Sequence, residues 1–422
     1  MFMGCGRMEK NYRVTTFVMD SGERYCMVVD RASGLPMYYP TLFLTTQIRN
    51  KGNAFSTTLA AANNLVLLLR FLESRDINLE ERLLTKDFFK PHEMDDLRDF
   101  AQRKQGRMPS KAFSNPWLDD ELVNIVDNGT QHSRLTTFAN YLRWYAMHIL
   151  KMPELDVVEQ IKTMATQIKV RRPSKKSRNS TLQDRSLSDV QLDVLFETIK
   201  LDSEWNPFSI DVQRRNRLMI LLLYHLGIRG GELLNIRIQD IDFSSNRIRI
   251  VRRADERADS RTNEPNAKTR ERLIPLAESL AQELHSYITK DRRKVQNAKK
   301  NDYLFVTYKR GPTVGNPISK AGYHKIFSLV KDVSPQLYTV TGHSLRHTWN
   351  RKFSERMDAM DEPVSEERQE QIRAYLQGWK PGSGTAATYN KRFIQQKGFE
   401  AALALQEGNG TRLPKDMKID DE

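Results

Sequence analysis

The period of the hydrophobic pattern changes at Ser56, and this change most limits what the chain can fold into. Before it, residues 12–48 hold the runs YRVTTFVMD and ERYCMVVD, which alternate with a period of two around the turns DSG and RASG. After it, STTLAAANNLVLLLRFLESRDI repeats with the helical period. Alternation around glycine-containing turns predicts antiparallel strands, whereas the longer period predicts an amphipathic helix. We therefore expect a small hairpin or meander that is followed by helices.

The helical pattern continues over residues 53–165. A second strong helix is predicted in TQHSRLTTFANYLRWYAMHIL, and shorter stretches such as HEMDDLRDFAQRK lie between the two. Helices with one apolar stripe bury it against each other, so this region is expected to be a compact all-helical domain. We expect the hairpin of residues 1–52 to pack on this domain, although a contact with accessory DNA is the alternative. The predicted core face of the first helix consists of Leu59, Ala62, Leu65, Leu69 and Leu72.

Composition shifts sharply at residues 166–185, TQIKVRRPSKKSRNSTLQDR. Seven basic residues stand against one acidic residue, with one proline and three serines. This pattern indicates an exposed interdomain linker whose charge suits a DNA phosphate backbone, while a plain solvated tether remains open. The candidate DNA-backbone contacts are Lys169, Arg171, Arg172, Lys175, Lys176 and Arg178.

A further domain is predicted from residue 186 to about 406. Ser188 and Gln191 form a capping-box pattern ahead of an apolar helix. RIRIVRR (247–253) alternates like a strand and ERLIPL (271–276) like its partner, and most of the remainder is helical. The fold class is therefore expected to be mainly α with a small antiparallel sheet. The predicted segments are 1–52, 53–165, 166–185, 186–406 and a C-terminal tail, 407–422.

Charge and cysteine content narrow the functional classes. The 422 residues carry a net charge of +14, which favours a polyanionic partner such as nucleic acid over a merely basic cytosolic protein. Two cysteines, Cys5 and Cys26, provide no disulfide framework or Cys-rich zinc module and fit a reducing cytoplasm. Neither the N-terminus nor the apolar run at 218–228 matches a signal peptide or a membrane span. We expect a soluble cytoplasmic protein without a membrane partner.

Residues 343–347, HSLRH, place two histidines and an arginine within five positions. His343 and His347, four residues apart, suit one face of a helix, which is a spacing that metal-binding histidines use. A zinc hydrolase motif would place a glutamate beside the first histidine, where Ser344 stands, so no metal is predicted. Arg346 instead suits a phosphate, because guanidinium offers a planar fork of donors and stays charged.

Two other segments carry residues of the same chemistry. Arg229, in LGIRGGELL, lies between a long apolar helix and a further helix start, where Glu232 is placed to orient it. An internal pair between these two side chains is the structural alternative. Tyr389, in GWKPGSGTAATYNKRF, stands among small and basic residues, which suits a phenol that meets a phosphate. Tyr375 has the apolar neighbours of a core residue.

Taken in order, these motifs resemble those of the tyrosine recombinase (phage integrase) family. GIRGGELLNIRIQDID is similar to the family's first arginine box, HSLRHTW to its second, and GWKPGSGTAATYNKRF to its final segment. NAKTRERLIPL resembles the strand pair that carries the family's lysine. The resemblance spans about residues 53–405. It implies a helical core-binding domain and a mixed α/β catalytic domain that together form a clamp around DNA.

The resemblance also implies a reaction: cleavage and rejoining of DNA strands at specific sites through a 3′-phosphotyrosyl intermediate, with no cofactor. Arg229, Arg346 and His343 would then bind the nonbridging phosphate oxygens, with Trp379 donating its indole N–H. Lys268 would protonate the leaving 5′ oxygen, Tyr389 would be the nucleophile, and Glu232 and His347 would support the site. The implied partners are double-stranded DNA, three further copies in a homo-tetramer on two sites, and accessory DNA-bending or directionality proteins. The implied setting is the integration or excision of a mobile element in a bacterial, nucleoid-associated context.

Several alternatives stay open at this point. The loop before Lys268 is long, so Arg253 or Arg270 is a second candidate for the general acid. The spacing from Trp379 to Tyr389 is one residue longer than is usual for the family. A type IB topoisomerase-like enzyme and a non-catalytic DNA-binding protein on the same fold are rival functions. The target sequence and the element are not encoded in any motif.

Overall fold

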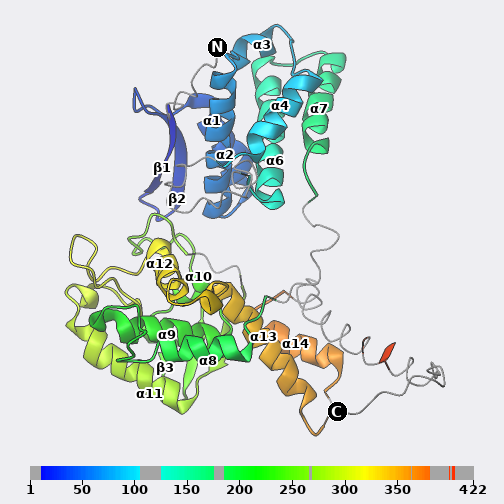
Figure 1. Ribbon diagram of the computed structural model, residues 1–422. Coiled ribbons are helices and arrows are strands. Elements are labelled where there is room, and N and C mark those ends of the chain that lie inside the picture. Colours follow the sequence, from blue (N-terminus) through cyan, green and yellow to red (C-terminus); the bar gives the residue numbers. More distant parts are fainter. Residues whose placement is uncertain are drawn as a thin grey trace, which may run out of the picture. The chain divides into compact units, whose positions relative to one another are not determined.

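The computed structural model describes residues 11–104, 125–174, 185–265, 269–362 and 364–380, together with 399, 402 and 403. The chain divides into two compact units, Met1–Gln183 (unit 1) and Asp184–Glu422 (unit 2), shown in Figure 1. Both are mainly helical, and each contains one small antiparallel sheet. The predicted fold class, mainly α with a small antiparallel sheet, is confirmed. The finer division into five segments stays a prediction.

Unit 1 is a helical bundle with a β-hairpin packed along it (Figure 1). The hairpin pairs Tyr12 with Asp30 and Val18 with Arg24. Its inward residues, among them Cys26 and Val28, belong to the same apolar core as the helices. The elements are β1 (Tyr12–Val18), β2 (Arg24–Asp30), α1 (Tyr38–Phe43), α2 (Phe55–Ser74), α3 (Leu79–Leu84), α4 (Pro91–Gln102), α6 (Asn128–Ile149) and α7 (Leu155–Val170).

The predicted β-region extends too far. Strands were expected over residues 12–48, but the chain after β2 is helical from Tyr38 to Lys51, so the sheet is a hairpin and not a meander. Tyr39 explains part of this difference, because its ring packs on Tyr145 of α6, with ring centroids 4.5 Å apart. A tertiary contact of this kind overrides the strand preference of a tyrosine-rich run.

Helix α2 is the centre of the unit 1 core. Ala62, Leu65 and Leu72 are buried as expected, whereas Leu59 and Leu69 are only partly buried. The predicted face was too narrow, since the hairpin, α4 and α6 cover α2 from several sides and bury further apolar positions. Among the described helices, α2 is also the one whose length and hydropathy would suit a membrane, and its apolar side chains are packed inside unit 1.

Unit 2 is built around α9, whose leucines are buried among the surrounding helices and the sheet. The sheet order is β3-β4-β5, all antiparallel, and Ile248 faces Ile241 on one side and Ile274 on the other. The predicted pairing of 247–253 with 271–276 is thus confirmed at its centre. The elements are α8 (Asp189–Thr198), α9 (Ile210–Leu226), α10 (Gly230–Leu233), β3 (Ile241–Asp242), β4 (Arg247–Ile250), β5 (Arg272–Pro275), α11 (Glu278–Ser286), α12 (Lys320–Lys331), α13 (Gly342–Asp358) and α14 (Glu366–Gln377).

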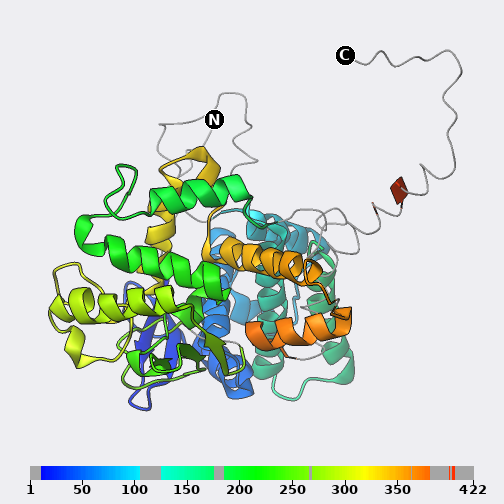
Figure 2. The same ribbon diagram turned by 90° about the horizontal axis from the view of Figure 1, so that it is seen from below.

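Local capping starts two of these helices where the sequence indicates. Ser188 caps α8: its hydroxyl accepts the Gln191 N–H at 3.2 Å, and Gln191 accepts the Ser188 N–H at 3.0 Å, as predicted. Thr341 caps α13 in the same way through Ser344. Figures 1 and 2 show α13 and α14 side by side, and Arg373 of α14 donates to Ser354 of α13 at 2.8 Å.

Candidate active site

Arg229 is held at the junction of α9 and α10. Helix α9 ends at Gly227, whose φ of 61° reverses the chain, and a Cβ there would lie 2.7 Å from Gln377 and Trp349. Arg229 is the N-cap of α10, and its backbone N–H donates to Glu232 at 2.8 Å. Its guanidinium lies 3.9 Å from the same carboxylate and is 37% exposed. Glu232 therefore orients Arg229 mainly through the backbone.

The carboxylate of Glu232 is instead bound to Arg272, a residue that the sequence analysis did not select. Both oxygens of Glu232 accept from the Arg272 guanidinium, at 3.0 and 3.2 Å, and the hydroxyl of Thr269 also donates to Glu232. Burial raises the pKa of Glu232, but the hydrogen bonds and charge of Arg272 outweigh it and leave the pKa below its ordinary value. Glu232 is thus a buried carboxylate anion.

Arg346 is the most deeply placed residue of the site. It lies on α13, is 2% exposed, and donates to the carbonyl of Gly227 at 2.7 Å and to that of Gln377 at 3.2 Å. The Trp379 ring packs against its guanidinium, with the ring centroid 5.5 Å away. The ends of α9 and α14 therefore fix the direction of this side chain.

The two histidines of HSLRH share one face of α13. Their Nε2 atoms are 3.0 Å apart, so one ring donates to the other and the pair cannot be fully protonated in this contact. Burial lowers the pKa of His343, and the charges of Arg346, Arg185 and Arg229 lower it further. No group of three metal-ligating residues lies among the described residues. The position of His347 suits support of the His343 ring.

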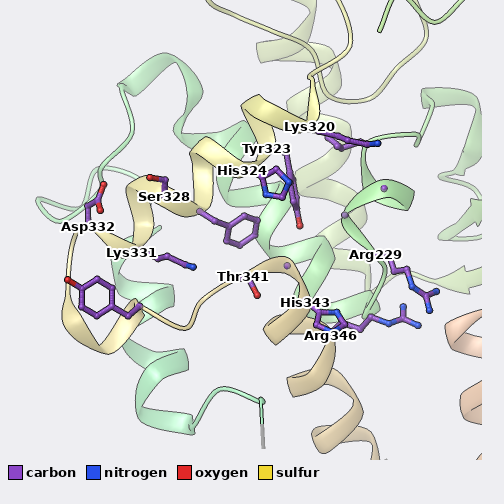
Figure 3. Close-up of a pocket in the computed structure, with 16 residues that line it drawn as sticks. Arg229, Lys320, Tyr323, His324, Ser328, Lys331, Asp332, Thr341, His343 and Arg346 are labelled. Carbon is purple, nitrogen blue, oxygen red and sulfur yellow. The ribbon is translucent and has the colours of Figure 1, made fainter. Parts of the chain in front are cut away.

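A cavity of about 690 Å³ opens at these residues and continues along α12. Figure 3 shows Arg229, His343 and Arg346 together at one end, with Lys331 and Asp332 at the other. Glycines in α10 and α13 leave room for the side chain of Tyr323 from α12. A Cβ on Gly342 would lie 1.8 Å from the Tyr323 hydroxyl. The α12 lining was missed by the sequence analysis, although cationic and polar residues at helical spacing were a usable signal. Its members are Lys320, Tyr323, His324, Phe327, Ser328, Lys331 and Asp332.

Other candidates fall in different places. Trp379 is 6% exposed and packs behind Arg346, and it is not among the residues that line the cavity. The Arg253 guanidinium donates to both carboxylate oxygens of Asp240, at 2.7 and 3.0 Å, and so forms a structural ion pair. Arg270 is exposed, and its N–H donates to the carbonyl of Gly378. Tyr375 was predicted to be a core residue, and this was wrong, because it is 59% exposed on α14.

The nucleophile and the lysine stay predictions, because Tyr389 and Lys268 lie outside the described residues. The neighbour of Lys268 is informative, since Thr269 is buried and donates to Glu232. Lys268 is therefore attached directly to a residue that contacts the Arg229 segment.

The predicted basic linker begins later than expected. Helix α7 continues to Val170 and includes Lys169, and Arg171 pairs with Asp95 at 2.5 Å. Arg172 donates to the carbonyl of Lys169 at 2.8 Å. These three residues belong to the end of unit 1. Helix α7 includes Lys169, the ion pair with Asp95 holds Arg171, and the hydrogen bond to the Lys169 carbonyl holds Arg172. Lys175, Lys176 and Arg178 lie outside the described residues.

Comparison with known proteins finds a family match within unit 2. Residues 187–361 match the model of the phage integrase family, and this stretch contains Arg229, Glu232, His343 and Arg346. This stretch of the chain is similar to the phage integrase family of tyrosine recombinases. Its relatives include tyrosine recombinase XerD of Halalkalibacterium halodurans, 28% identical over 34% of this chain and 40% of the relative. Tyrosine recombinase XerC of Staphylococcus saprophyticus is 27% identical over 38% of this chain and 44% of the relative.

The matched region is limited in extent. The chain spans about two fifths of the length of these curated relatives. Among solved structures, the Tn1549 transposon integrase in complex with transposon right-end DNA is 16% identical and covers 87% of this chain and 100% of that chain, with a TM-score of 0.47. XerH recombinase bound to its difH substrate is 14% identical and covers 83% and 90%, with a TM-score of 0.39.

Proposed function

We propose that this tyrosine recombinase cleaves and rejoins DNA strands at specific sites through a 3′-phosphotyrosyl intermediate. The observation that carries the proposal is the convergence of Arg229 and Arg346, 117 positions apart in the chain, with His343 at one end of a single cavity. Two guanidinium groups in one opening suit a group with two anionic oxygens. A DNA phosphodiester has this chemistry.

The residues have distinct roles in the proposed reaction. The Tyr389 oxygen attacks phosphorus and forms a P–O bond to the enzyme, while the bond from phosphorus to the 5′ oxygen breaks. The 5′ oxygen leaves as a hydroxyl with a proton from Lys268. Arg229 and Arg346 stabilise the charge that grows on the nonbridging oxygens. Rejoining is the reverse, with a 5′-hydroxyl as the nucleophile and Tyr389 as the leaving group.

His343 acts in this scheme as a neutral imidazole. The lowered pKa favours the uncharged ring at neutral pH, which suits a hydrogen bond to the phosphate or acceptance of the Tyr389 proton. Trp379 packs against Arg346. We propose that this contact holds the guanidinium toward the phosphate, and that Trp379 adds its N–H only if the site tightens on DNA.

The partner is proposed to be a DNA duplex that both units contact. Lys320, His324 and Lys331 line the continuation of the cavity and suit the backbone of a strand that leaves the cleavage site. Lys169, Arg171, Arg172, Lys175, Lys176 and Arg178 are proposed as further backbone contacts. We propose a homo-tetramer that joins two sites, with accessory proteins, to integrate or excise a mobile element in the bacterial cytoplasm.

The decisive experiment traps the covalent intermediate. A nicked duplex library with a randomised centre is incubated with the protein in the presence of excess chelator, and DNA bound to denatured protein is sequenced. The protein should form an adduct at a preferred sequence without a metal ion, and Tyr389→Phe should bind the same DNA without forming one. If the protein binds DNA but forms no adduct, the non-catalytic rival is correct. Adducts without sequence preference would favour a relaxase.

A further inference from the structure

We propose that Arg272 is a positioning residue. Its bidentate ion pair with Glu232 holds together the three chain segments that form the site. This inference rests on the proposed function. The three segments are the Arg229 turn, the chain that follows Lys268, and the end of α14 before Trp379.

Arg272 makes contacts to all three segments. Its Nη1 and Nη2 atoms bind Glu232, which in turn accepts the Arg229 N–H at 2.8 Å. Its Nη1 also lies 3.3 Å from the Arg270 carbonyl and 3.4 Å from the Thr269 hydroxyl. Its Nε donates to the Leu376 carbonyl of α14 at 2.7 Å. One guanidinium thus fixes the spacing of chain segments that lie 2, 40 and 104 positions from it in sequence.

The α14 contact leads directly to Arg346. Leu376 is followed by Gln377, whose carbonyl accepts from Arg346 at 3.2 Å, and then by Gly378 and Trp379. Gly378 has a φ of 63°, and a Cβ on it would lie 2.6 Å from the Arg272 guanidinium. The backbone of α14 therefore closes tightly over Arg272. A shift of that guanidinium would move the acceptor that orients Arg346.

Stability alone does not account for this ion pair. The side chains of Arg272 and Glu232 are 1% and 0% exposed, and a pair so deeply buried contributes little net stability because both charges lose their hydration. Strand β5 supports the same reading: its period of two turns Arg272 inward and leaves Leu273 46% exposed. An apolar residue at the inward position would fill the core at lower cost, so the role of the arginine lies in the groups that it orients.

The test compares two buried arginines of unit 2. Arg272→Lys keeps the charge but loses the fork, and single-turnover cleavage should slow by about 100-fold, the effect of a misplacement near 1 Å. DNA affinity should stay unchanged, because the Arg272 side chain is buried and cannot reach DNA. Arg292→Lys is the matched control, since Arg292 is buried and donates to three backbone carbonyls, of Tyr303, Ala298 and Asn301, none of which lines the cavity. The control should cleave at the normal rate.

A double variant guards against misfolding. Glu232→Met with Arg272→Met removes both charges together, which buried pairs tolerate. It should unfold with normal cooperativity and yet cleave as slowly as Arg272→Lys. A normal rate in either variant, an equal loss in Arg292→Lys, or a parallel loss of DNA affinity would overturn the proposal.

Amide hydrogen exchange tests the same inference without catalysis. The Arg229 N–H, which donates to Glu232, and the Arg270 N–H, which donates to Gly378, should exchange faster in Arg272→Lys than in the unmodified protein. Arg292→Lys should leave both unchanged. If the protein forms no adduct at all, the proposed function fails, while unchanged exchange in Arg272→Lys would refute the positioning role by itself.

Discussion

The two units differ in how many charged side chains they bury. Within the described part of unit 1, Arg24 is the one buried charged side chain, and the other buried side chains are apolar apart from Thr58 and Gln131. Unit 2 has a core of similar apolar character, yet it buries a whole set of charged side chains. These are Arg215, Glu232, Asp240, Asp259, Arg261, Glu264, Arg272, Arg292, Arg346 and Arg373.

This difference fits the proposed function, in which unit 2 carries out the chemistry. A buried charge is costly unless hydrogen bonds or an opposite charge replace the lost hydration. In the proposed function unit 1 only has to fold and bind DNA, and such a unit has no need for buried charges. In unit 2, the burial of charged side chains costs stability and holds guanidinium groups in fixed directions. Arg346 and Glu232 are the examples at the candidate active site.

The largest expected effect comes from exchanging one buried arginine in each unit for methionine. Arg346→Met should lower the single-turnover cleavage rate about 1000-fold, because a donor aimed at transition-state charge is lost. Arg24→Met, which loses a 2.6 Å hydrogen bond to the Gly22 carbonyl, should lower the stability of unit 1 and leave cleavage within about threefold. Equal losses of cleavage rate would erase the distinction between the units.

The apolar cores, by contrast, should respond alike. Leu68→Ala in α2 and Leu222→Ala in α9 each truncate a side chain with 0% exposure. Each should lower the free energy of unfolding by about 3 kcal/mol through lost burial and the cavity left behind. Urea unfolding followed by circular dichroism measures both. A much smaller effect in α9 would mean that the buried polar network, and not the leucines, holds unit 2.

The salt dependence of DNA binding tests the proposed phosphate contacts. Replacing Lys175, Lys176 and Arg178 with glutamine should reduce the slope of log affinity against log salt by up to about three, since each phosphate contact releases a counterion. Arg171→Gln should change the slope less, because its guanidinium already pairs with Asp95. Affinities measured across a salt series give both slopes. An unchanged slope in the triple variant would reduce that segment to a tether.

The smallest expected effect is on how the stability of unit 2 depends on pH. Because the pKa of His343 is lowered on folding, the unfolded chain binds the proton more readily. The protein should lose stability as pH falls from 7 to 5, with this contribution intact above the ordinary histidine pKa. His343→Gln should make the free energy of unfolding less dependent on pH over that range. Chemical denaturation at several pH values measures it, and an unaltered slope would contradict the lowered pKa.

Much of the fold follows from local sequence. The hairpin turn, the Ser188 capping box, the long helices and the pairing of the two strands in unit 2 depend on neighbours a few residues apart, which the printed sequence displays. The arginine boxes are likewise local patterns, so the sequence predicts Arg229, His343 and Arg346 as site residues, and the structure places all three at one cavity. The helical turn over residues 38–51 was missed, because Tyr39 is held by a ring more than 100 positions away.

The amino-acid sequence alone identified the candidate residues for the proposed chemistry, since a guanidinium or an imidazole keeps its chemical nature in any fold. Only the tertiary structure decided their partners. Glu232 was assigned to Arg229, three residues away, but its carboxylate binds Arg272, 40 residues away, because β5 turns that arginine inward beneath α10. Arg253, a candidate general acid by its position in the sequence, forms an ion pair with Asp240. Such pairings depend on which buried charges meet in space, and sequence separation does not encode that distance.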